Sequence, residues 1–489
     1  MGQKKDRGIV YKFNITNEMR LPLKSKAVSV DVVHRELHQP FEESPDNRRK
    51  IIIVGGGPAG IMAAWNLADS FDVMLFEKSA RLGRKFLLAG KGGLNITNSA
   101  DAADLKKVYS PEGVMDKVLD HFDQKAFREW LMQLGIQTYE GTSGKVFPEK
   151  GMDVTTVLKK ITDSLLDRGV TIYLNHRLTG FTGKKQKVSD GEMRFTFDIH
   201  ESGLEEHREV QYVADIAVLA LGGASWPLTG SDGKWVEIFN HNGISTLPFQ
   251  PSNCGVNLDW PTAVKQFHAG KPLKNLVITV ETADKYADTL LEESTVPGDG
   301  SLSHHHNISE SHHTHTASKG EALITEYGLK GTAIYPLIPE VRLLLAKKLN
   351  PFLSIDFKPK NTTEQLLKKI IGKKTSTFGK VLALDTAQMA VIKAFTGKEE
   401  FMDAYRFCSA IKKLILPVKS LRPVEEAISV VGGIDHTDLV DDFSLRRFPH
   451  IYTIGEMINW DAPTGGYLLQ GCFSMGKYVA DKIKSKPHF

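Results

Sequence analysis

The feature that most constrains this chain is a glycine-rich turn between a buried strand and a helix. Residues 50–54 read Lys-Ile-Ile-Ile-Val, a β-branched run typical of a strand buried on both faces. The turn at residues 55–60, Gly-Gly-Gly-Pro-Ala-Gly, follows directly and leads into a helical pattern that extends to about Ser70. A second apolar strand at residues 73–77 completes a βαβ unit of ordinary length.

This turn fits the G-x-G-x-x-G pattern of dinucleotide-binding folds. In that pattern the first glycine permits the tight turn, the second lets backbone approach a pyrophosphate, and the third lets the helix pack closely on the sheet. The free N–H groups at the helix start favour the phosphates. The predicted contacts of the turn are Gly55, Gly57, Pro58, Ala59 and Gly60. Glu77, at the end of the second strand, is placed to accept hydrogen bonds from a ribose hydroxyl.

The turn does not distinguish FAD from NAD, but the C-terminal segment favours FAD. Residues 451–456 read as a strand that ends in Gly455-Glu456, and such an ending places a carboxylate near the ribitol hydroxyls. Residues 464–467, Thr-Gly-Gly-Tyr, open a final helix that extends to about Lys484. The N–H groups of that helix start can face the N1–C2=O edge of a flavin, where negative charge develops on reduction. The predicted contacts here are Gly455, Glu456, Thr464, Gly465, Gly466 and Tyr467.

Further cofactor contacts are predicted in several loops. Arg84 and Lys85 either neutralise pyrophosphate charge or form a basic loop face. The full set of these predicted contacts is Lys78, Arg84, Lys85, Lys91, Asn95, Thr97, Leu178 and Gly222. No catalytic residue is assigned, and the candidates for a general acid or base are Lys91, Tyr335 and Tyr467.

The chain divides into a polar extension, a split domain and an insertion. Residues 1–49 form the extension, residues 50–247 and 420–489 the split domain, and residues 248–419 the inserted domain. In the split domain we expect helices at 111–135 and 154–168 and strands at 170–174, 195–199 and 214–221. The inserted domain contains a helical part at about 362–415.

Residues 297–319 hold six of the 17 histidines in a Ser-, Thr- and Gly-rich stretch. Because no Cys or carboxylate lies there at ligand spacing, we interpret the stretch as a flexible surface loop and expect no metal.

The composition excludes several classes of protein. The net charge is +4, so nucleic acid is not an expected partner, and Lys368-Lys369 with Lys373-Lys374 reads as the solvated face of a helix. No apolar stretch is long enough to span a bilayer, and the N-terminal residues lack the apolar core of a signal peptide. Three widely spaced cysteines, Cys254, Cys408 and Cys472, indicate buried thiols in a cytoplasmic protein. The sequence defines no oligomeric state.

Several segments together resemble the bacterial flavoproteins of the aminoacetone-oxidase-like class, also described as NAD(P)/FAD-dependent oxidoreductases. That class includes a bile-acid dienone reductase. The segments that carry the resemblance are residues 82–90, 95–98, 144–148, 220–227, 320–331, 455–456 and 464–470. One segment departs from the class, because residues 90–95 read Gly-Lys-Gly-Gly-Leu-Asn where much of it has Gly-Gly-Arg-Cys-Asn. The chain is therefore similar to a distinct branch, to which chemistry that depends on that cysteine does not carry over.

The resemblance implies an α/β fold, with a glutathione-reductase-like FAD domain of Rossmann type split by an inserted domain that combines a small β-barrel with helices. The implied function is an FAD-dependent oxidoreductase that transfers hydride between flavin N5 and a small organic substrate. Because the sequence contains no second dinucleotide turn, NAD(P)H is expected only as a transient electron donor, and reoxidation by oxygen stays open. Two alternatives also stay open: a flavin-dependent RNA-modifying enzyme or monooxygenase, and a non-catalytic FAD-binding protein.

Overall fold

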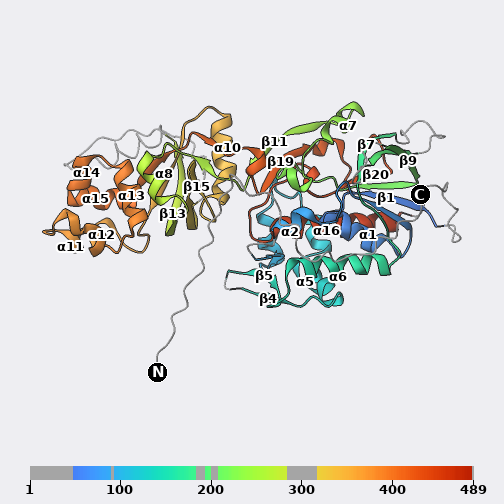
Figure 1. The fold of residues 1–489 in the computed structure, drawn as a ribbon, viewed down its shortest axis with the longest axis horizontal. Coiled ribbons are helices and arrows are strands. Elements are labelled where there is room, and N and C mark those ends of the chain that lie inside the picture. The colour runs from blue at the N-terminus through green and yellow to red at the C-terminus, as the bar shows by residue number, and fades with distance from the viewer. Residues whose placement is uncertain are drawn as a thin grey trace, which may run out of the picture. The chain divides into compact units, whose positions relative to one another are not determined.

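The chain forms two compact units (Figure 1). A computed structural model describes residues 48–89, 93–141, 143–182, 193–199, 208–282 and 317–486. In this part of the chain the larger unit comprises residues 48–254 and 422–486, and the smaller unit comprises residues 255–421. The chain thus leaves the larger unit after Cys254 and returns to it at Arg422, whereas the sequence places the two divisions after residues 247 and 419.

A five-stranded parallel sheet forms the centre of the larger unit, with the strand order β20-β10-β1-β2-β6. The strands are β1 (Lys50–Val54), β2 (Asp72–Phe76), β6 (Thr171–Tyr173), β10 (Ile216–Leu219) and β20 (Ile451–Thr453). Ile53 pairs with Leu75 on one side and with Val218 on the other, so β1 is buried between its neighbours as its β-branched sequence predicts. The sheet therefore contains strands from both parts of the split unit.

Two helices that are far apart in sequence pack against each other beside this sheet. α1 (Pro58–Leu67) follows the glycine turn, and α16 (Tyr467–Ser485) is the final helix of the chain (Figure 1). The contact is close because α16 presents Gly476 to α1, where a methyl group would collide with the carbonyl oxygen of Ala59. Both helices contribute buried side chains to one continuous core that also includes the sheet.

The other helices of the larger unit begin at polar caps that the sequence supplies. α6 (Val154–Asp167) begins after Asp153, whose carboxylate accepts a hydrogen bond from Thr156 N–H at 2.7 Å. The helical stretch expected at 111–135 is two helices, α4 (Asp116–His121) and α5 (Gln124–Gln133). The expectation of one continuous stretch is wrong because Asp123 accepts hydrogen bonds from the first N–H groups of α5 and so starts a new helix. The remaining helices are α2 (Arg84–Ala89), α3 (Ala102–Lys107) and α7 (Val236–His241).

Three small antiparallel sheets complete the larger unit. One contains β3 (Thr97–Asn98), β5 (Lys145–Pro148) and β4 (Thr138–Glu140). The second contains β7 (His176–Thr182), β8 (Met193–Ile199) and β9 (Arg208–Ala214). The third pairs β11 (Thr246–Ser252) with β19 (Ser429–Ile434), the two strands next to the passages into and out of the smaller unit.

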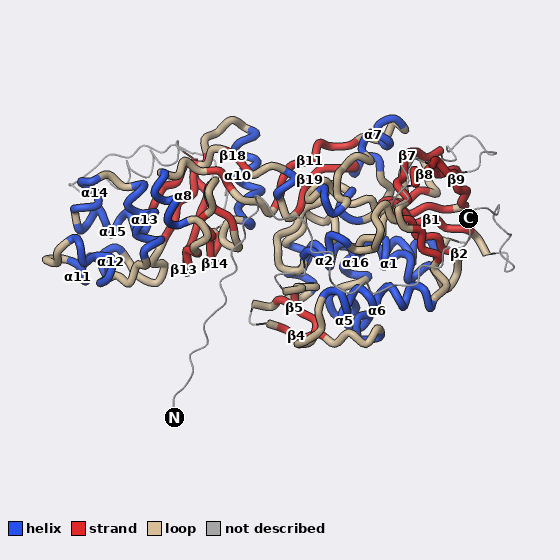
Figure 2. The backbone as a smooth tube through the Cα atoms, viewed as in Figure 1, coloured by secondary structure: helices blue, strands red, loops and turns tan. Residues whose placement is uncertain are grey.

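The smaller unit consists of a seven-stranded sheet and a group of helices (Figure 2). In sheet order the strands are β17 (Leu414–Pro417), β16 (Pro351–Asp356), β13 (Pro272–Thr282), β14 (Ser318–Ile324), β15 (Gly328–Lys330), β12 (Val256–Asn257) and β18 (Ser420–Leu421). The helices are α8 (Thr262–His268), α10 (Ile338–Ala346), α11 (Thr363–Ile370), α12 (Phe378–Val381), α13 (Thr386–Phe395), α14 (Lys398–Met402) and α15 (Ala404–Lys412). The expected small β-barrel is not confirmed by this order, in which β17 and β18 are the two end strands.

Some expectations from the sequence concern residues that the structure does not describe. The extension up to residue 47, Lys91 and residues 297–316 of the His-rich stretch lie outside the described residues. None of the helices in the described ranges combines the length and apolarity that crossing a bilayer requires. All three cysteines are described, are buried and form no disulfide, which confirms the expectation of buried thiols.

Candidate cofactor-binding site

The first glycine of the turn is required by a close approach between neighbouring strands. Gly55 has a φ of +111°, and its N–H donates to the carbonyl of Phe76 at 2.7 Å. A methyl group at this position would collide with the carbonyl oxygen of Ala220, which follows β10. Both the backbone angle and the available space therefore demand glycine at the carboxyl edge of the sheet.

The second glycine has a different environment. Gly57 lies in ordinary extended backbone, and a methyl group added to it would meet no atom of the described residues within 4 Å. Gly57 is also the N-cap of α1, so no side chain caps this helix, and Pro58 occupies its first turn. By contrast, a methyl group at Gly60 would collide with the carbonyl oxygen of Gly55. The turn is thus packed at its ends and open in its middle, at an uncapped helix N-terminus.

Glu77 fastens this turn to the second strand. One carboxylate oxygen accepts the N–H of Gly56 at 2.8 Å, and the other accepts the N–H of Ser79 at 2.8 Å. Gly56 is also closely packed, because a methyl group there would displace the end of the Leu82 side chain. The sequence motif treats Gly56 as a free position, so this requirement could not be found from the motif spacing. The predicted ribose contact of Glu77 is compatible with these bonds, since a carboxylate can accept about four hydrogen bonds.

The carboxylate of Glu456 is paired with a lysine from the other part of the split unit. Lys85 Nζ lies 2.7 Å from a carboxylate oxygen of Glu456 and donates to Ser225 Oγ at 2.8 Å. Ser225 is buried, and the Glu456 side chain is mostly buried. Lys85 and Glu456 were both expected to contact the cofactor, but their pairing with each other leaves no local trace in the sequence.

The C-terminal Gly-Glu element lies against the start of α1. Gly455 begins a short 3₁₀ segment, η7 (Gly455–Met457), with a φ of +80°. A methyl group at Gly455 would lie 3.1 Å from Cβ of Ala59, and one at Gly223 would lie 3.7 Å from Cβ of Glu456. The structure therefore brings together the glycine turn, the glycine pair after β10 and the Gly455-Glu456 pair, as the sequence analysis expects.

The start of α16 makes a similarly close contact. Gly466, the N-cap of α16, has a φ of +93°, and a methyl group there would lie 2.5 Å from Cα of Thr97. Thr97 is buried, and its hydroxyl donates to the side-chain oxygen of Gln470 at 2.5 Å. No described residue accepts a hydrogen bond from the N–H groups of Gly465 or Gly466. This second helix start therefore also presents unused donors.

Five buried side-chain polar atoms of the larger unit have no hydrogen-bond partner among the described residues, on Asn95, Gln124, Trp130, Ser231 and Thr453, and two of them lie at or beside predicted cofactor residues. One is the side-chain oxygen of Asn95, two residues before Thr97. The other is Ser231 Oγ, which lies beside Gly222. Gly222 itself has a φ of +73°, and its carbonyl accepts the indole N–H of Trp235 at 2.9 Å. Because buried polar atoms are normally satisfied, these two indicate places for ligand atoms.

Lys78 is held away from the turn by an ion pair. Its ammonium group lies 2.8 Å from Asp232, whose other carboxylate oxygen lies 3.1 Å from Arg177. Burial of Asp232 alone would raise its pKa, but the hydrogen bonds from Lys78 and Arg177 lower the pKa below its usual value. Leu178, the neighbour of Arg177, is buried in β7 opposite Phe197 of β8. Its predicted cofactor contact would therefore involve backbone.

The other predicted residues lie in different settings. Arg84 is exposed at the first position of α2. The carbonyl of Tyr467 accepts the hydroxyl of Tyr109 at 2.7 Å, and burial raises the pKa of Tyr467. Tyr335 lies in η3 (Tyr335–Leu337) of the smaller unit, so the structure does not relate it to these residues.

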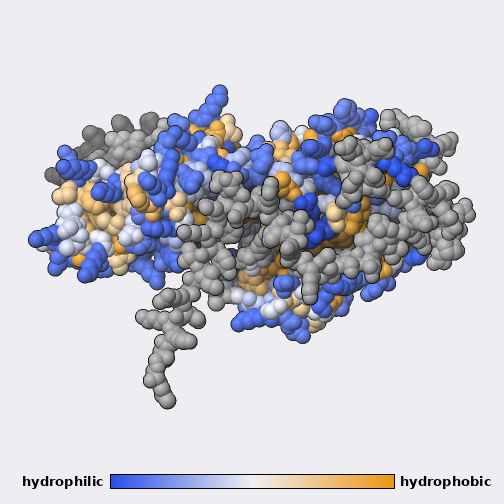
Figure 3. Space-filling view, viewed as in Figure 1, coloured by the Kyte–Doolittle hydropathy of each residue, from blue (hydrophilic) through white to orange (hydrophobic). Residues whose placement is uncertain are grey.

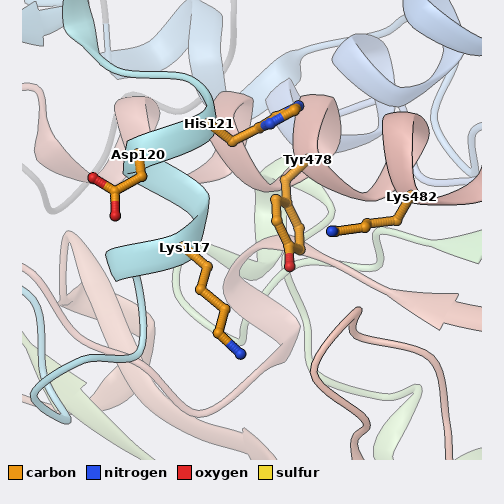
Figure 4. Close-up of a pocket in the computed structure, with 5 residues that line it drawn as sticks. All are labelled: Lys117, Asp120, His121, Tyr478 and Lys482. Carbon is orange, nitrogen blue, oxygen red and sulfur yellow. The ribbon is translucent and has the colours of Figure 1, made fainter. Parts of the chain in front are cut away.

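A surface cavity of about 350 Å³ lies elsewhere on the larger unit, between α4 and α16 (Figure 4). It contains none of the predicted cofactor residues; its lining consists of Lys117, Asp120, His121, Tyr478 and Lys482. Lys117 lies 2.6 Å from Asp441, and the ammonium of Lys482 lies 5.2 Å from the centre of the Tyr478 ring. Because none of the predicted cofactor residues lines this cavity, we assign it no function. Among the described residues, no group of three or more His, Cys, Asp or Glu side chains has the arrangement of a metal site.

Comparison with known proteins agrees with this class of fold, an α/β protein with a Rossmann-type nucleotide site. Residues 49–482 match the family described as the HI0933-like protein Rossmann domain. The chain belongs to this family of FAD- and NAD(P)-binding Rossmann proteins, and is thereby a flavoprotein of the oxidoreductase class.

Two characterised relatives are similar over nearly their whole length. One is the 3-dehydro-bile acid delta(4,6)-reductase of Clostridium scindens, which is 25% identical over 458 residues, or 89% of this chain and 99% of the relative. The other is the ribosomal RNA dihydrouridine synthase of Escherichia coli K12, which is 24% identical over 433 residues, or 86% of this chain and 95% of the relative. Among solved structures, a 3-ketosteroid delta1-dehydrogenase from Sterolibacterium denitrificans aligns with a TM-score of 0.44 at 14% identity, covering 90% of this chain and all of that one.

Proposed function

We propose that the protein is an FAD-dependent reductase whose substrate is a small organic molecule with a carbon–carbon double bond conjugated to a carbonyl. The observation that carries the cofactor assignment is the open space at Gly57, at the uncapped start of α1, inside a turn whose other glycines are all tightly packed. A pyrophosphate fits this position because it needs backbone donors and no Cβ. When bound, FAD supplies hydride-transfer chemistry at flavin N5.

The other residues around the turn suit the remaining parts of FAD. Glu77 would hold the adenosine ribose, and Glu456 the ribitol. The unpartnered oxygen of Asn95 would accept an N–H of the flavin ring, and the free N–H groups of Gly465 and Gly466 would donate to a flavin carbonyl. Lys85 orients the Glu456 carboxylate through its 2.7 Å ion pair.

The names of the two relatives support a reductase that acts on an activated double bond. By their names, a Δ4,6-reductase of a 3-dehydro-bile acid and a dihydrouridine synthase both reduce a carbon–carbon double bond that is conjugated to a carbonyl. Such a reaction requires a proton at the carbon next to the carbonyl after hydride arrives at the far carbon. Tyr467 is a candidate donor, because it is the first residue of α16, next to the glycine pair, and its phenol is protonated at neutral pH. We propose NADH or NADPH as the transient donor of the hydride.

The test starts with the absorbance spectrum of the purified full chain. Anaerobic mixing with NADH and with NADPH is expected to bleach the flavin band, and a 3-oxo-4,6-diene steroid is expected to restore it. Protein that neither carries nor binds FAD would contradict the cofactor assignment. A flavin that neither nucleotide reduces would contradict the proposed donor, and reduced flavin that no enone reoxidises would contradict the proposed substrate class.

A second candidate function, modification of RNA, is favoured by a specific surface of the smaller unit. Residues 358–419 contain thirteen Lys and Arg but five Asp and Glu, although the whole chain carries a net charge of only +4. Hydrophilic residues mark the end of the unit where Figure 1 places α11 and α12 (Figure 3). The lysines there that are exposed and form no ion pair with any described residue are Lys360, Lys368, Lys369, Lys373, Lys374 and Lys380.

One of these lysines, Lys369, lies close enough to Lys358 to affect its pKa. Burial lowers the pKa of Lys358, and the positive charge of Lys369 lowers that pKa further. The negative charge of Asp385 acts in the opposite direction and raises the pKa. A uridine-containing RNA is the probe for this function, because two relatives are ribosomal RNA dihydrouridine synthases. The double variant Lys373→Glu and Lys374→Glu should weaken RNA binding much more than Lys125→Glu and Lys150→Glu, which make the same charge change in the larger unit. Equal weakening by both pairs would contradict a specific RNA surface.

A further inference from the structure

Asn253 lies where the chain passes from the larger unit into the smaller unit. It follows β11 and precedes by two residues the first residue of the smaller unit, Gly255. Asn253 is 1% exposed and has a φ of +48°, a left-handed conformation that asparagine tolerates better than most residues. A buried polar side chain in this backbone conformation requires a specific set of partners.

The carboxamide of Asn253 has such a set of partners, most of them in the loop before α16. Its side-chain N–H₂ donates to the carbonyl of Ala462 and to Ser429 Oγ, both at 2.7 Å. Its side-chain oxygen accepts the N–H of Thr464 at 3.1 Å. The amide therefore pairs with the backbone of residues 462–464 on both its donor and its acceptor side, as a peptide group of a neighbouring strand would.

The preceding residue fixes the other end of the same loop. Ser252 Oγ lies 2.7 and 2.8 Å from the two carboxylate oxygens of Asp461, a buried acid. One of these oxygens also accepts the N–H of Ala462 at 2.9 Å. The backbone of Asp461 in turn bonds to that of Ser110 in both directions, at 2.7 and 2.9 Å. The loop is thus held from residue 461 to residue 464, directly before the glycine pair that starts α16.

We propose that Asn253 is a positioning residue for the cofactor, which sets the conformation of residues 462–464 so that the free N–H groups of Gly465 and Gly466 face the flavin. This inference rests on the proposed function, because it assumes that FAD binds at the start of α16. Asn253 acts through the loop and does not itself touch the cofactor. A loop held by two directional amide bonds loses less conformational freedom when the ligand binds, so affinity depends on them.

The same arrangement gives Asn253 a role in the reduction potential. Backbone donors at a helix start stabilise the negative charge that develops on a reduced flavin. If residues 462–464 move, those donors are less well aimed, and the reduced form loses more stabilisation than the oxidised form. The flavin midpoint potential of an Asn253 variant should therefore become more negative, a change that a residue needed only for packing would not produce.

The decisive variants are Asn253→Asp and Asn253→Ala in the full chain, with Asn257→Asp as the matched control. Asp is isosteric, keeps the acceptor for Thr464 and loses the donor to Ala462. Asn257, in β12 of the smaller unit, makes a comparable pair of amide bonds, to Ser420 Oγ at 2.7 Å and to the carbonyl of Leu421 at 3.3 Å. The readouts are thermal unfolding, FAD affinity by fluorescence titration and the flavin midpoint potential.

Both Asn253 variants are expected to fold, to bind FAD about fivefold or more weakly, and to have a more negative potential, since one lost hydrogen bond costs about 1 kcal/mol, which is about fivefold in affinity. Asn257→Asp is expected to match the wild-type protein in FAD affinity and potential. A folded Asn253→Asp protein with wild-type affinity and potential would overturn the inference, and so would failure of both Asn253 variants to fold. Wild-type protein that binds no FAD would instead defeat the proposed function.

Discussion

Lys85 and Glu456, 371 residues apart in the chain, form a 2.7 Å ion pair at the edge of the candidate site. We expect this pair to be coupled, because the Glu456 side chain is mostly buried and would be left without its counterion if Lys85 were removed. In a double-mutant cycle with Lys85→Met and Glu456→Gln, the free energies of unfolding should deviate from additivity by about 1–2 kcal/mol. Urea unfolding of the four proteins measures this, and additivity within about 0.3 kcal/mol would show that the pair is not coupled.

Replacement of two glycines in the same turn should separate folding from cofactor binding. Gly57→Ala adds a methyl group in open space at an allowed φ, so stability should fall by no more than about 1 kcal/mol, the cost of alanine at a helix N-cap. Its affinity for FAD should nevertheless fall by about tenfold or more, because the methyl group fills the space that a pyrophosphate requires. Gly55→Ala should instead destabilise the fold by at least about 2 kcal/mol, through its φ of +111° and its collision with Ala220. Thermal unfolding and flavin titration of both variants check this contrast, and a Gly57→Ala protein with normal FAD affinity would exclude this position as the pyrophosphate site.

The close contact between Gly466 and Thr97 should make Gly466→Ala more destabilising than the same substitution at a glycine with a similar φ and no close neighbour. Gly151 has a φ of +95° and open space around its Cα, whereas Gly466 has a φ of +93° and Thr97 beside it. Gly151→Ala should therefore cost only the backbone strain, about 1–2 kcal/mol. Gly466→Ala should cost at least about 1 kcal/mol more, because the added methyl group would also displace Thr97. Equal losses in denaturant unfolding would mean that the backbone of Thr97 can move aside freely.

The three thiols should be inert in the folded protein. Cys254, Cys408 and Cys472 are all buried. Burial raises the pKa of Cys408 to about 11, and burial also raises that of Cys472 well above its usual value, so neither forms a thiolate at neutral pH. A thiol reagent such as dithionitrobenzoate is expected to label none of them in native buffer and all three in guanidinium. Rapid labelling of native protein at any of these cysteines would contradict the burial.

Acid should remove a stabilising contribution from Asp481. Burial of Asp481 alone would raise its pKa, but hydrogen bonds from Lys477, Lys484 and His121 lower the pKa to about 2. The pKa of the folded state thus lies below that of the unfolded state, so the stabilisation is complete above about pH 4 and is lost as the pH falls toward 2. Asp481→Asn should cost about 0.5–1 kcal/mol at pH 7, a value reduced by solvent screening, and almost nothing near pH 2. Denaturant unfolding across this range checks the sign, and a pH-independent difference would refute it.

Local sequence patterns predicted the features that depend on neighbouring residues. Short stretches of sequence specify the β1–α1–β2 unit, the glycine turn and the final helix. Buried strands, tight turns and helix starts each require particular residue types, so a local pattern is enough to predict them. The break between α4 and α5 was missed, although Asp123 is a typical N-cap, because the apolar spacing continues across it.

Features that join distant segments could not be predicted in this way. Lys85 pairs with Glu456, and Asn253 bonds to residues 209 and 211 positions further along the chain, and no periodicity connects such positions. The sequence therefore indicated candidate cofactor residues one by one but gave no sign that Lys85 and Glu456 are partners of one another. The close packing at Gly56 likewise depends on the side chain of Leu82, which the motif does not include.

The position of β20 in the central sheet has a consequence for synthesis of the protein on the ribosome. β20 pairs with β10, and α16 packs on α1, yet both are translated only after the whole smaller unit. The first part of the larger unit therefore emerges with an unpaired strand edge and an uncovered apolar helix, and must wait for about 170 further residues, residues 255–421, before it can close. During that interval the nascent chain is a natural client for a chaperone.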